Sequence, residues 1–337
     1  MKKEFRSILV LLSFSIFFNS LMAQNKNFGV HQNFSIKSAG GWDYLTVYGN
    51  KLYVSHGTQV NILDKNTGDS IGFIPNTTGV HGIAFDPIHQ LGFTSNGRLN
   101  NVYVFNVSNN EIKATIATGE NPDAIMYDPF SKTIITCNGR SKDLSFIDAN
   151  TLQLIATVAV GGKPETAVTN MAGKIFVNVE DKNEIVVINT NTHLVEAHWS
   201  IASIESPTGL AIDKANKRLF AGGEKLLGVI NAETGNMITT IGIGDGCDGV
   251  AFDNTTKLIF TSNGEGTMSI IKEIDANHFS LLENMPTAKG ARTIAIDENT
   301  HKIYLPTADF EPLPADAKPN TRPKMIPGSF KILVANK

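Results

Sequence analysis

Short hydrophobic runs alternate with turn-forming residues along almost the whole chain. Each run is a few residues long, is rich in β-branched and aromatic side chains, and is bounded by Gly, Asp, Asn or Pro, as is typical of β-strands. After residue 23 no amphipathic stretch is long enough to predict a substantial helix. The pattern therefore predicts an all-β protein.

The runs recur with a fixed period. The word FTSNG stands at 93–97 and again at 260–264, and the near-copy ITCNG stands at 135–139, which is 42 residues after the first. A period of this size is typical of one supersecondary unit repeated along the chain. Alignment on these words yields seven units of four strands, which predicts a single seven-bladed β-propeller over residues 24–337.

Each unit begins with a strand that is expected to be innermost. These strands are expected near 44–48, 82–86, 124–128, 166–170, 209–213, 249–253 and 293–297. A turn follows each of them, and its Asp or Asn can cap the turn with its own side chain. Unit seven runs out of chain after its third strand, whereas residues 30–41 resemble a fourth strand. We therefore expect the N-terminus to close the ring, which removes an open sheet edge.

The first 23 residues differ from the repeats. Lys2, Lys3 and Arg6 form a basic start, residues 8–18 are an apolar run, and Ala23 is a small residue before Gln24. This order is typical of a secretory signal peptide, and the apolar run is too short for a good membrane span. We expect residues 1–23 to be removed on export to the periplasm or the medium, and no membrane span in the remaining chain.

Composition narrows the function classes. The chain has 29 Lys and Arg against 32 Asp and Glu, a net charge of −3, and it shows no basic face interleaved with aromatic residues. Nucleic acid is therefore not expected as a partner. The two cysteines, Cys137 and Cys247, fall in units three and six on opposite sides of the expected ring, so no disulfide is expected.

Several words resemble the YVTN-repeat (YncE-like) propellers. The segment LSFIDANTLQLIATVAVGGKPETAV at 144–168 is similar to that family's repeat, and FTSNG is similar to its Y-V-T-N word. The resemblance covers nearly all of residues 24–337 and departs from the family in unit seven, where a proline-rich loop spans 309–328. It implies the propeller fold. It says little of function, because related propellers serve as binding platforms, assembly scaffolds or enzymes.

Seven equivalent positions are expected to ring the mouth of the central channel, one before each innermost strand. They are Asp43, His81, Asp123, Glu165, Thr208, Asp248 and Arg292. Residues with a purely structural role would stay alike from repeat to repeat, whereas these diverge. The functional interpretation is a polar ligand site, to which the proline-rich loop would add Lys318 and Arg322. The alternative is a solvent-exposed rim in which the carboxylates and Arg292 neutralise one another.

Two functions follow from this ring. The first is an exported, monomeric binding or scaffold module that engages a small molecule or a protein partner at the channel mouth. The alternative is a lactonase-like hydrolase, with His81 and either Asp43 or Asp123 as general base and Arg292 as an electrostatic clamp. No cofactor is expected. The metal that converging oxygens would suit is Ca²⁺, with further ligands from Asn96, Asn138, Asn263 and Glu180.

Overall fold

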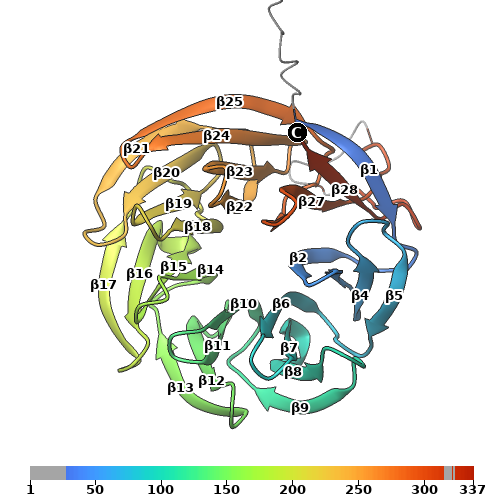
Figure 1. Ribbon diagram of the computed structural model, residues 1–337, viewed down its shortest axis with the longest axis horizontal. Coiled ribbons are helices and arrows are strands. Elements are labelled where there is room, and N and C mark those ends of the chain that lie inside the picture. Colours follow the sequence, from blue (N-terminus) through green and yellow to red (C-terminus); the bar gives the residue numbers. More distant parts are fainter. Residues whose placement is uncertain (1–27, 315–320, 322) are drawn as a thin grey trace, which may run out of the picture.

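The protein is a seven-bladed β-propeller, as predicted (Figure 1). The computed structural model describes residues 28–314, 321 and 323–337, so the expected signal peptide lies outside the described residues. Seven four-stranded antiparallel sheets surround a central channel. The helical segments of the described chain are two short 3-10 turns, η1 (Gly97–Leu99) and η2 (Glu180–Lys182). Within the same residues, no helix has the length and apolar character needed to cross a membrane.

The strands follow one order in every blade, from the channel outward. The inner strands are β2 (Trp42–Tyr48), β6 (Val80–Asp86), β10 (Pro122–Asp128), β14 (Pro164–Thr169), β18 (Gly209–Asp213), β22 (Cys247–Asp253) and β26 (Ala295–Asp297). The second strands are β3 (Lys51–His56), β7 (Leu91–Asn96), β11 (Thr133–Asn138), β15 (Lys174–Val179), β19 (Arg218–Gly222), β23 (Leu258–Asn263) and β27 (Lys302–Thr307). The third strands are β4 (Gln59–Asp64), β8 (Asn101–Asn106), β12 (Asp143–Asp148), β16 (Glu184–Asn189), β20 (Leu226–Asn231), β24 (Thr267–Asp275) and β28 (Lys331–Asn336). The outer strands are β5 (Ser70–Ile74), β9 (Ile112–Ala117), β13 (Gln153–Ala159), β17 (Leu194–Ser200), β21 (Met237–Gly242), β25 (His278–Pro286) and β1 (Gly29–Ser35).

The N-terminal strand closes the ring, as predicted. Strand β1 pairs antiparallel with β28, and the sheet of blade seven runs in the order β1, β28, β27, β26. The two ends of the propeller thus share one blade, whose strands β1 and β28 lie side by side in Figure 1. Because β1 and β28 come from opposite ends of the sequence, the ring can open here only if the whole pairing between these two strands is lost.

Apolar packing holds the blades against one another. Second and third strands are buried on both faces because a neighbouring blade covers each face, so their sequences are continuously apolar. Outer strands alternate instead, as in the part-exposed pattern of β17. The buried residues form seven clusters, and each cluster lies between two adjacent blades. Each blade therefore covers apolar residues of its neighbours, and Cys137 and Cys247 are both buried and free.

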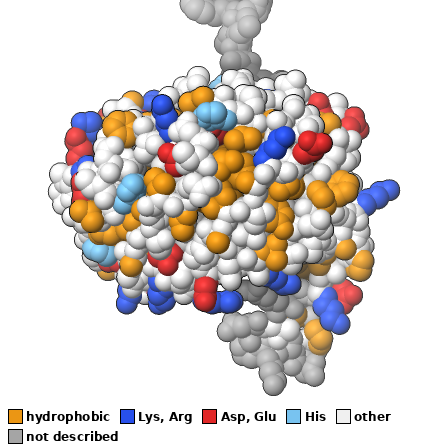
Figure 2. Space-filling model, turned by 90° about the horizontal axis from the view of Figure 1, so that it is seen from below, with side chains coloured by type: hydrophobic (Ala, Val, Ile, Leu, Met, Phe, Trp, Pro, Cys, Tyr) orange, Lys and Arg blue, Asp and Glu red, His pale blue; other side chains and the backbone are white. Residues whose placement is uncertain are grey.

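Apolar side chains lie in groups among polar ones on the outer wall (Figure 2). Strands β9 and β13 form the part of the wall that faces the viewer in Figure 2. Ile112, Leu154 and Ile155 on these strands are 40%, 43% and 47% exposed. Exposed apolar residues are common on the surfaces of folded proteins.

Buried aspartates fasten the blades at the end of the channel opposite the ring. The carboxylate that ends an inner strand accepts N–H groups of its own turn, as Asp128 does from Phe130 and Ser131. It also accepts a donor from the following blade: Thr169 donates to Asp128 at 2.7 Å, and Lys257 donates to Asp213 at 3.1 Å. The repeated aspartate therefore shapes a turn and links two blades at once.

A second carboxyl lies beside one of these aspartates. Glu273 on β24 is 2% exposed, and its Oε1 accepts a hydrogen bond of 3.0 Å from Asn216. Its Oε2 is buried and has no donor among the described residues. Burial, reinforced by the charge of Asp213, raises the pKa of Glu273 to about 7. A proton on Glu273 therefore supplies the donor that this pair of carboxyl groups needs.

We expect the stability of the protein to fall as the pH rises from 5 to 8, in part because of Glu273. Its pKa is higher in the folded than in the unfolded chain, so its contribution is complete below the unfolded pKa and is lost as the pH passes about 7. The variant Glu273→Gln keeps a donor at every pH, and should be more stable than the parent at pH 8 by about 1–3 kcal/mol. Denaturant titrations at both pH values measure this difference. Equal pH dependence in parent and variant would contradict the assignment, and Glu298→Gln on an exposed turn is the control.

Candidate functional site at the channel mouth

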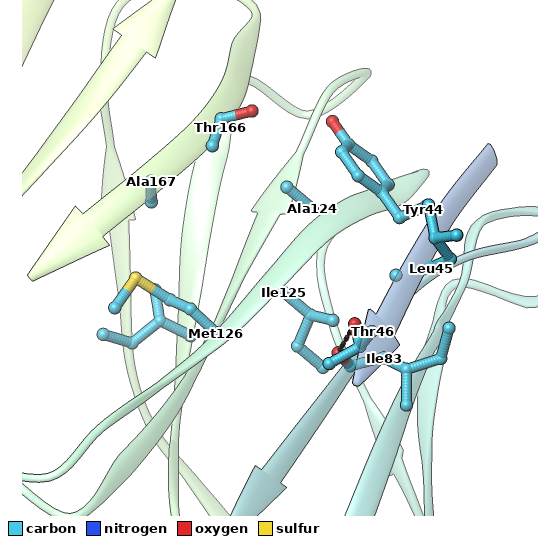
Figure 3. A pocket seen from close by; sticks show the side chains of 11 residues that line it. Tyr44, Leu45, Thr46, Ile83, Ala124, Ile125, Met126, Thr166 and Ala167 are labelled. Carbon is cyan, nitrogen blue, oxygen red and sulfur yellow. Dashed lines mark hydrogen bonds between the residues drawn. The ribbon is translucent and has the colours of Figure 1, made fainter. Parts of the chain in front are cut away.

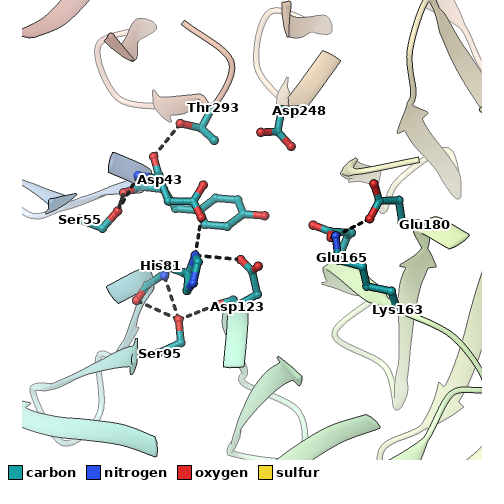
Figure 4. A network of polar contacts seen from close by, with 12 residues as sticks. Asp43, Ser55, His81, Ser95, Asp123, Lys163, Glu165, Glu180, Asp248 and Thr293 are labelled. Atoms are coloured by element: carbon teal, nitrogen blue, oxygen red, sulfur yellow. Dashed lines mark hydrogen bonds and ion pairs between the residues drawn. The ribbon is translucent and has the colours of Figure 1, made fainter. Parts of the chain in front are cut away.

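The residues predicted to ring the mouth converge at one end of the channel (Figure 4), and most of them are the second residue of an inner strand and do not precede it. Three of them come from adjoining blades and touch directly. His81 Nδ1 donates to Asp43 Oδ2 at 2.6 Å and lies 3.6 Å from Asp123 Oδ1. The three side chains are between 15% and 26% exposed, so they face the mouth and are not sealed in the core.

Both ring nitrogens of His81 have neighbours in the protein. Nδ1 faces the two carboxylates, and Nε2 lies against Gly97 of η1, where an added Cβ would come within 2.7 Å of it. Burial alone would lower the pKa of His81, but the hydrogen bond to Asp43 and the charge of Asp123 outweigh it and raise that pKa to about 8. The imidazole is therefore cationic at neutral pH.

On the other side of the mouth, one lysine lies within ion-pair distance of two glutamates. Lys163 Nζ lies 2.6 Å from Glu165 and 2.5 Å from Glu180. Glu165 is only 7% exposed, and burial together with the charge of Asp123 raises its pKa to about 8 despite the lysine. A single ammonium lies between the two carboxyl groups, and the more buried Glu165 is the one whose pKa is raised.

Arg292 and Asp248 form the third group of the ring. Arg292 Nη1 lies 2.8 Å from Asp248 Oδ2, and the side chains are 45% and 20% exposed. Burial raises the pKa of Asp248 to about 6 even with Arg292 beside it, because Asp43 and Glu180 add negative charge. Arg292 is therefore paired through Nη1 with an acid of its own ring.

Hydroxyl groups fix the backbone of the ring and do not face a ligand. Thr208 donates to the carbonyl of Cys247 in the next blade at 2.7 Å. Thr293 donates in the same way to Asp43 O at 2.7 Å, and Ser95 donates to the carbonyl of Asp123. Thr208 was expected among the ligand-binding residues, but its hydroxyl is used in this support.

The ring holds more acid than base. Its carboxyl groups are Asp43, Asp123, Glu165, Glu180 and Asp248, and its cationic groups are His81, Lys163 and Arg292. Burial raises the pKa of Asp123 to about 6, and the negative charges of Asp43 and Asp248 act in the same direction. Protons bound to the carboxyl groups thus offset part of the excess negative charge of the ring, and an added positive charge would be stabilised here.

Below the ring the channel wall becomes apolar (Figure 3). A cavity of about 120 Å³ is lined by inner-strand residues of blades one to four, among them Ile83, Ile125, Met126 and Ala167. Tyr44 stands between this cavity and the ring, and burial, with the charges of Asp123 and Asp43, raises the pKa of its hydroxyl well above the usual value. The cavity has room for only a few heavy atoms, since one water occupies about 30 Å³ in the liquid.

One group of side chains could hold a metal ion. Asp43, His81 and Asp123 each present a ligand atom, and these atoms lie within 4.8 Å of one another. Two oxygens and one nitrogen suit a transition metal better than Ca²⁺, which prefers oxygens alone. The asparagines that were expected to add oxygens point elsewhere: Asn96, Asn138 and Asn263 are fully buried and bonded within their own blades.

Some expected residues lie elsewhere, and others were missed. Lys318 and Arg322 lie outside the described residues, so the structure does not place them relative to the ring. Lys163 and Tyr44 were not expected in the site. A signal for Lys163 was present, because a lysine stands in GGKPE where other repeats have glycine, asparagine or serine at the matching position. Tyr44 had no such signal, since it reads as an ordinary strand residue.

Comparisons with known proteins support the fold alone. The hydrazine synthase structure of Kuenenia stuttgartiensis superposes with a TM-score of 0.70 and 14% sequence identity, over 80% of this chain and 94% of that chain. No family model and no curated protein matches the sequence. The chain is thus defined as a seven-bladed β-propeller, and its likeness to the YVTN-repeat family rests on the repeated words alone.

Proposed function

We propose that this protein is an exported binding module whose channel mouth takes a small ligand with a cationic head and a short apolar body. The observation that carries the proposal is the pKa of Glu165, which is raised to about 8 although Lys163 lies 2.6 Å away. Burial is the largest cause of this shift, and the negative charges of Asp123 and Glu180 add to it, so a cation among these acids would be favoured. A ligand cation would replace the proton of Glu165, and the apolar cavity below would accept the body of the ligand.

The charge balance favours this ligand over an anion. Arg292 is paired with Asp248, and the imidazole of His81 is held by two carboxylates. An anion inside the ring would lie among carboxyl groups that outnumber these cations. A protein partner would meet the same site with a lysine or arginine side chain, which carries a cationic head on an apolar stem.

The hydrolase alternative has less support. For His81 to act as a general base, its imidazole must be neutral and within reach of the proton that it takes. His81 has its pKa raised to about 8, its Nδ1 bonds to Asp43, and its Nε2 packs against Gly97. We therefore place His81 in the binding site as a charged group that positions Asp43 and Asp123.

Calorimetry tests the proposal with agmatine, whose guanidinium and amine can both face the acids of the ring while its four-carbon stem lies over the apolar cavity. Titrations in two buffers of different ionisation enthalpy report the protons released on binding. We expect proton release near pH 7.5 and an affinity that rises about threefold to tenfold per pH unit between pH 6 and 8, because the ligand competes with the proton of Glu165. Mn²⁺ alone is titrated in parallel, since Asp43, His81 and Asp123 could hold a metal.

The variant Glu165→Gln should abolish most of the proton release and weaken agmatine binding by about tenfold. Glu224→Gln is the matched control, because Glu224 lies in a surface groove with Glu205 and Asp245, away from the ring. The proposal is wrong if neither agmatine nor Mn²⁺ binds. It is equally wrong if binding is independent of pH and insensitive to the Glu165 substitution.

A further inference from the structure

A second hollow opens beside the ring, where blades six, seven and one meet. It has a volume of about 500 Å³, and its side-chain lining is Trp42, Lys289, Arg292, Phe310 and Pro323, with glycines at the other positions. We name it the Trp42–Phe310 groove. Its size lies within the range of small-molecule sites, which is about 300–1,000 Å³. The ring and the groove share only Arg292.

The aromatic walls of the groove are held in place. Trp42 begins β2 and stacks on the buried Phe330, with ring centroids 5.1 Å apart. The rings of Trp42 and Phe310 are 6.1 Å apart and inclined by 44°. Phe310 also lies over Gly290, where an added Cβ would come within 3.1 Å of its ring. A side chain at Gly290 would therefore push Phe310 out of position.

The described ends of the proline-rich loop form a short ribbon that carries Phe310. Phe310 and Met325 form an isolated β-bridge. Backbone hydrogen bonds of 2.8 Å on either side run from Glu311 N to Lys324 O and from Ile326 N to Asp309 O. Because both strands of the ribbon are paired, the position of Phe310 is set by backbone geometry before any ligand arrives.

Two cationic side chains line the groove and have donors that no other described residue uses. Lys289 is exposed and makes no ion pair with any described residue. Arg292 bonds to Asp248 through Nη1, and within the described chain its other nitrogens have no acceptor. The groove therefore differs from the ring, in which acids outnumber cations.

We propose that the Trp42–Phe310 groove binds a small molecule that carries a carboxylate on a planar aromatic ring. The ring would lie against Trp42 and Phe310, since aromatic groups gain from offset or inclined contact at these separations. The carboxylate would accept hydrogen bonds from Lys289 and from the free side of the Arg292 guanidinium, whose planar fork matches carboxylate geometry. This inference goes beyond the proposed cation site, because it concerns a different hollow and a ligand of opposite charge.

The indole resonances of the full chain provide a direct test. The sequence contains two tryptophans, Trp42 and Trp199. Trp199 packs on Phe176 in blade four, away from the groove, and serves as an internal control. With naphthalene-2-carboxylate as the probe, we expect the Nε1–H signal of Trp42 to shift while that of Trp199 stays in place. Naphthalene-2-carboxamide, which lacks the charge, should bind at least about tenfold more weakly.

Two substitutions separate charge from stacking. Lys289→Gln should weaken binding of the carboxylate about fivefold or more and leave the carboxamide unaffected, while Phe310→Leu should weaken both. Lys225→Gln is the matched control, because Lys225 pairs with Asp245 outside the groove. The proposal fails if the Trp42 signal does not move at millimolar probe, if the carboxamide binds as well as the carboxylate, or if Lys289→Gln changes nothing. Agmatine binding at the ring is read by proton release, so failure of either site leaves the other test intact.

Discussion

Removal of β1 is expected to leave a chain that cannot hold the ring closed. The comparison is between a chain that begins at residue 28 and one that begins at residue 38, which lacks the whole strand Gly29–Ser35. The shorter chain loses the pairing with β28 and the buried side chains of Phe34 and Ile36, both 4% exposed. Large apolar side chains of this kind contribute about 2–5 kcal/mol each. Their joint loss is comparable with the whole stability of a typical domain, which is about 5–15 kcal/mol.

Denaturant unfolding of the two chains measures the effect. Phe34→Ala is the milder version, and it should cost about 3–5 kcal/mol because Phe34 lies over Gly68 in the cluster between blades one and seven. Phe130→Ala is the control, since that ring is 47% exposed and its loss should change stability by less than about 1 kcal/mol. If the chain that begins at residue 38 unfolds like the longer one, β1 does not stabilise the ring.

The second large effect is expected at the ion pair that joins the same two blades. Lys65 Nζ lies 2.8 Å from Asp297 Oδ2, and the side chains are only 8% and 2% exposed. The backbone oxygen of Lys65 also accepts a hydrogen bond of 2.9 Å from the buried hydroxyl of Tyr304. The variant Lys65→Met leaves Asp297 buried without its counter-charge, so we expect a loss of about 3–5 kcal/mol.

A double-mutant cycle tests this pair. Lys65→Met combined with Asp297→Asn should lose less stability than Lys65→Met alone, because the unpaired charge is then absent. Lys217→Met is the control for a lysine pair, since Lys217 and Glu233 are 56% and 59% exposed and such surface pairs contribute at most about 1 kcal/mol. A small effect of Lys65→Met, similar to that of Lys217→Met, would show that the buried pair does not secure the closure.

Much of the propeller could be predicted because short stretches of the sequence specify its strands and turns. A repeated run of β-branched residues followed by a turn specifies a strand and its end within a few positions. Seven such units, with one strand missing at the C-terminus and one in excess at the N-terminus, indicated both the ring and its closure by β1. Even the positions around the channel mouth could be predicted, since equivalent residues of a repeat occupy equivalent places.

The chemistry of those positions was decided by the tertiary structure, because it depends on partners far apart in the sequence. Whether His81 meets Asp43 and Asp123, or Arg292 meets Asp248, depends on how adjoining blades turn their side chains. Lys163 enters the ring because of its neighbours in space, and burial then determines that Glu165 keeps its proton. The turn aspartates are a similar case: the sequence by itself specified their turns, but only the folded ring brings Lys65 to Asp297 and Thr169 to Asp128. Local patterns determine strands and turns, whereas desolvation and charge act through space and therefore exist only once the blades have closed.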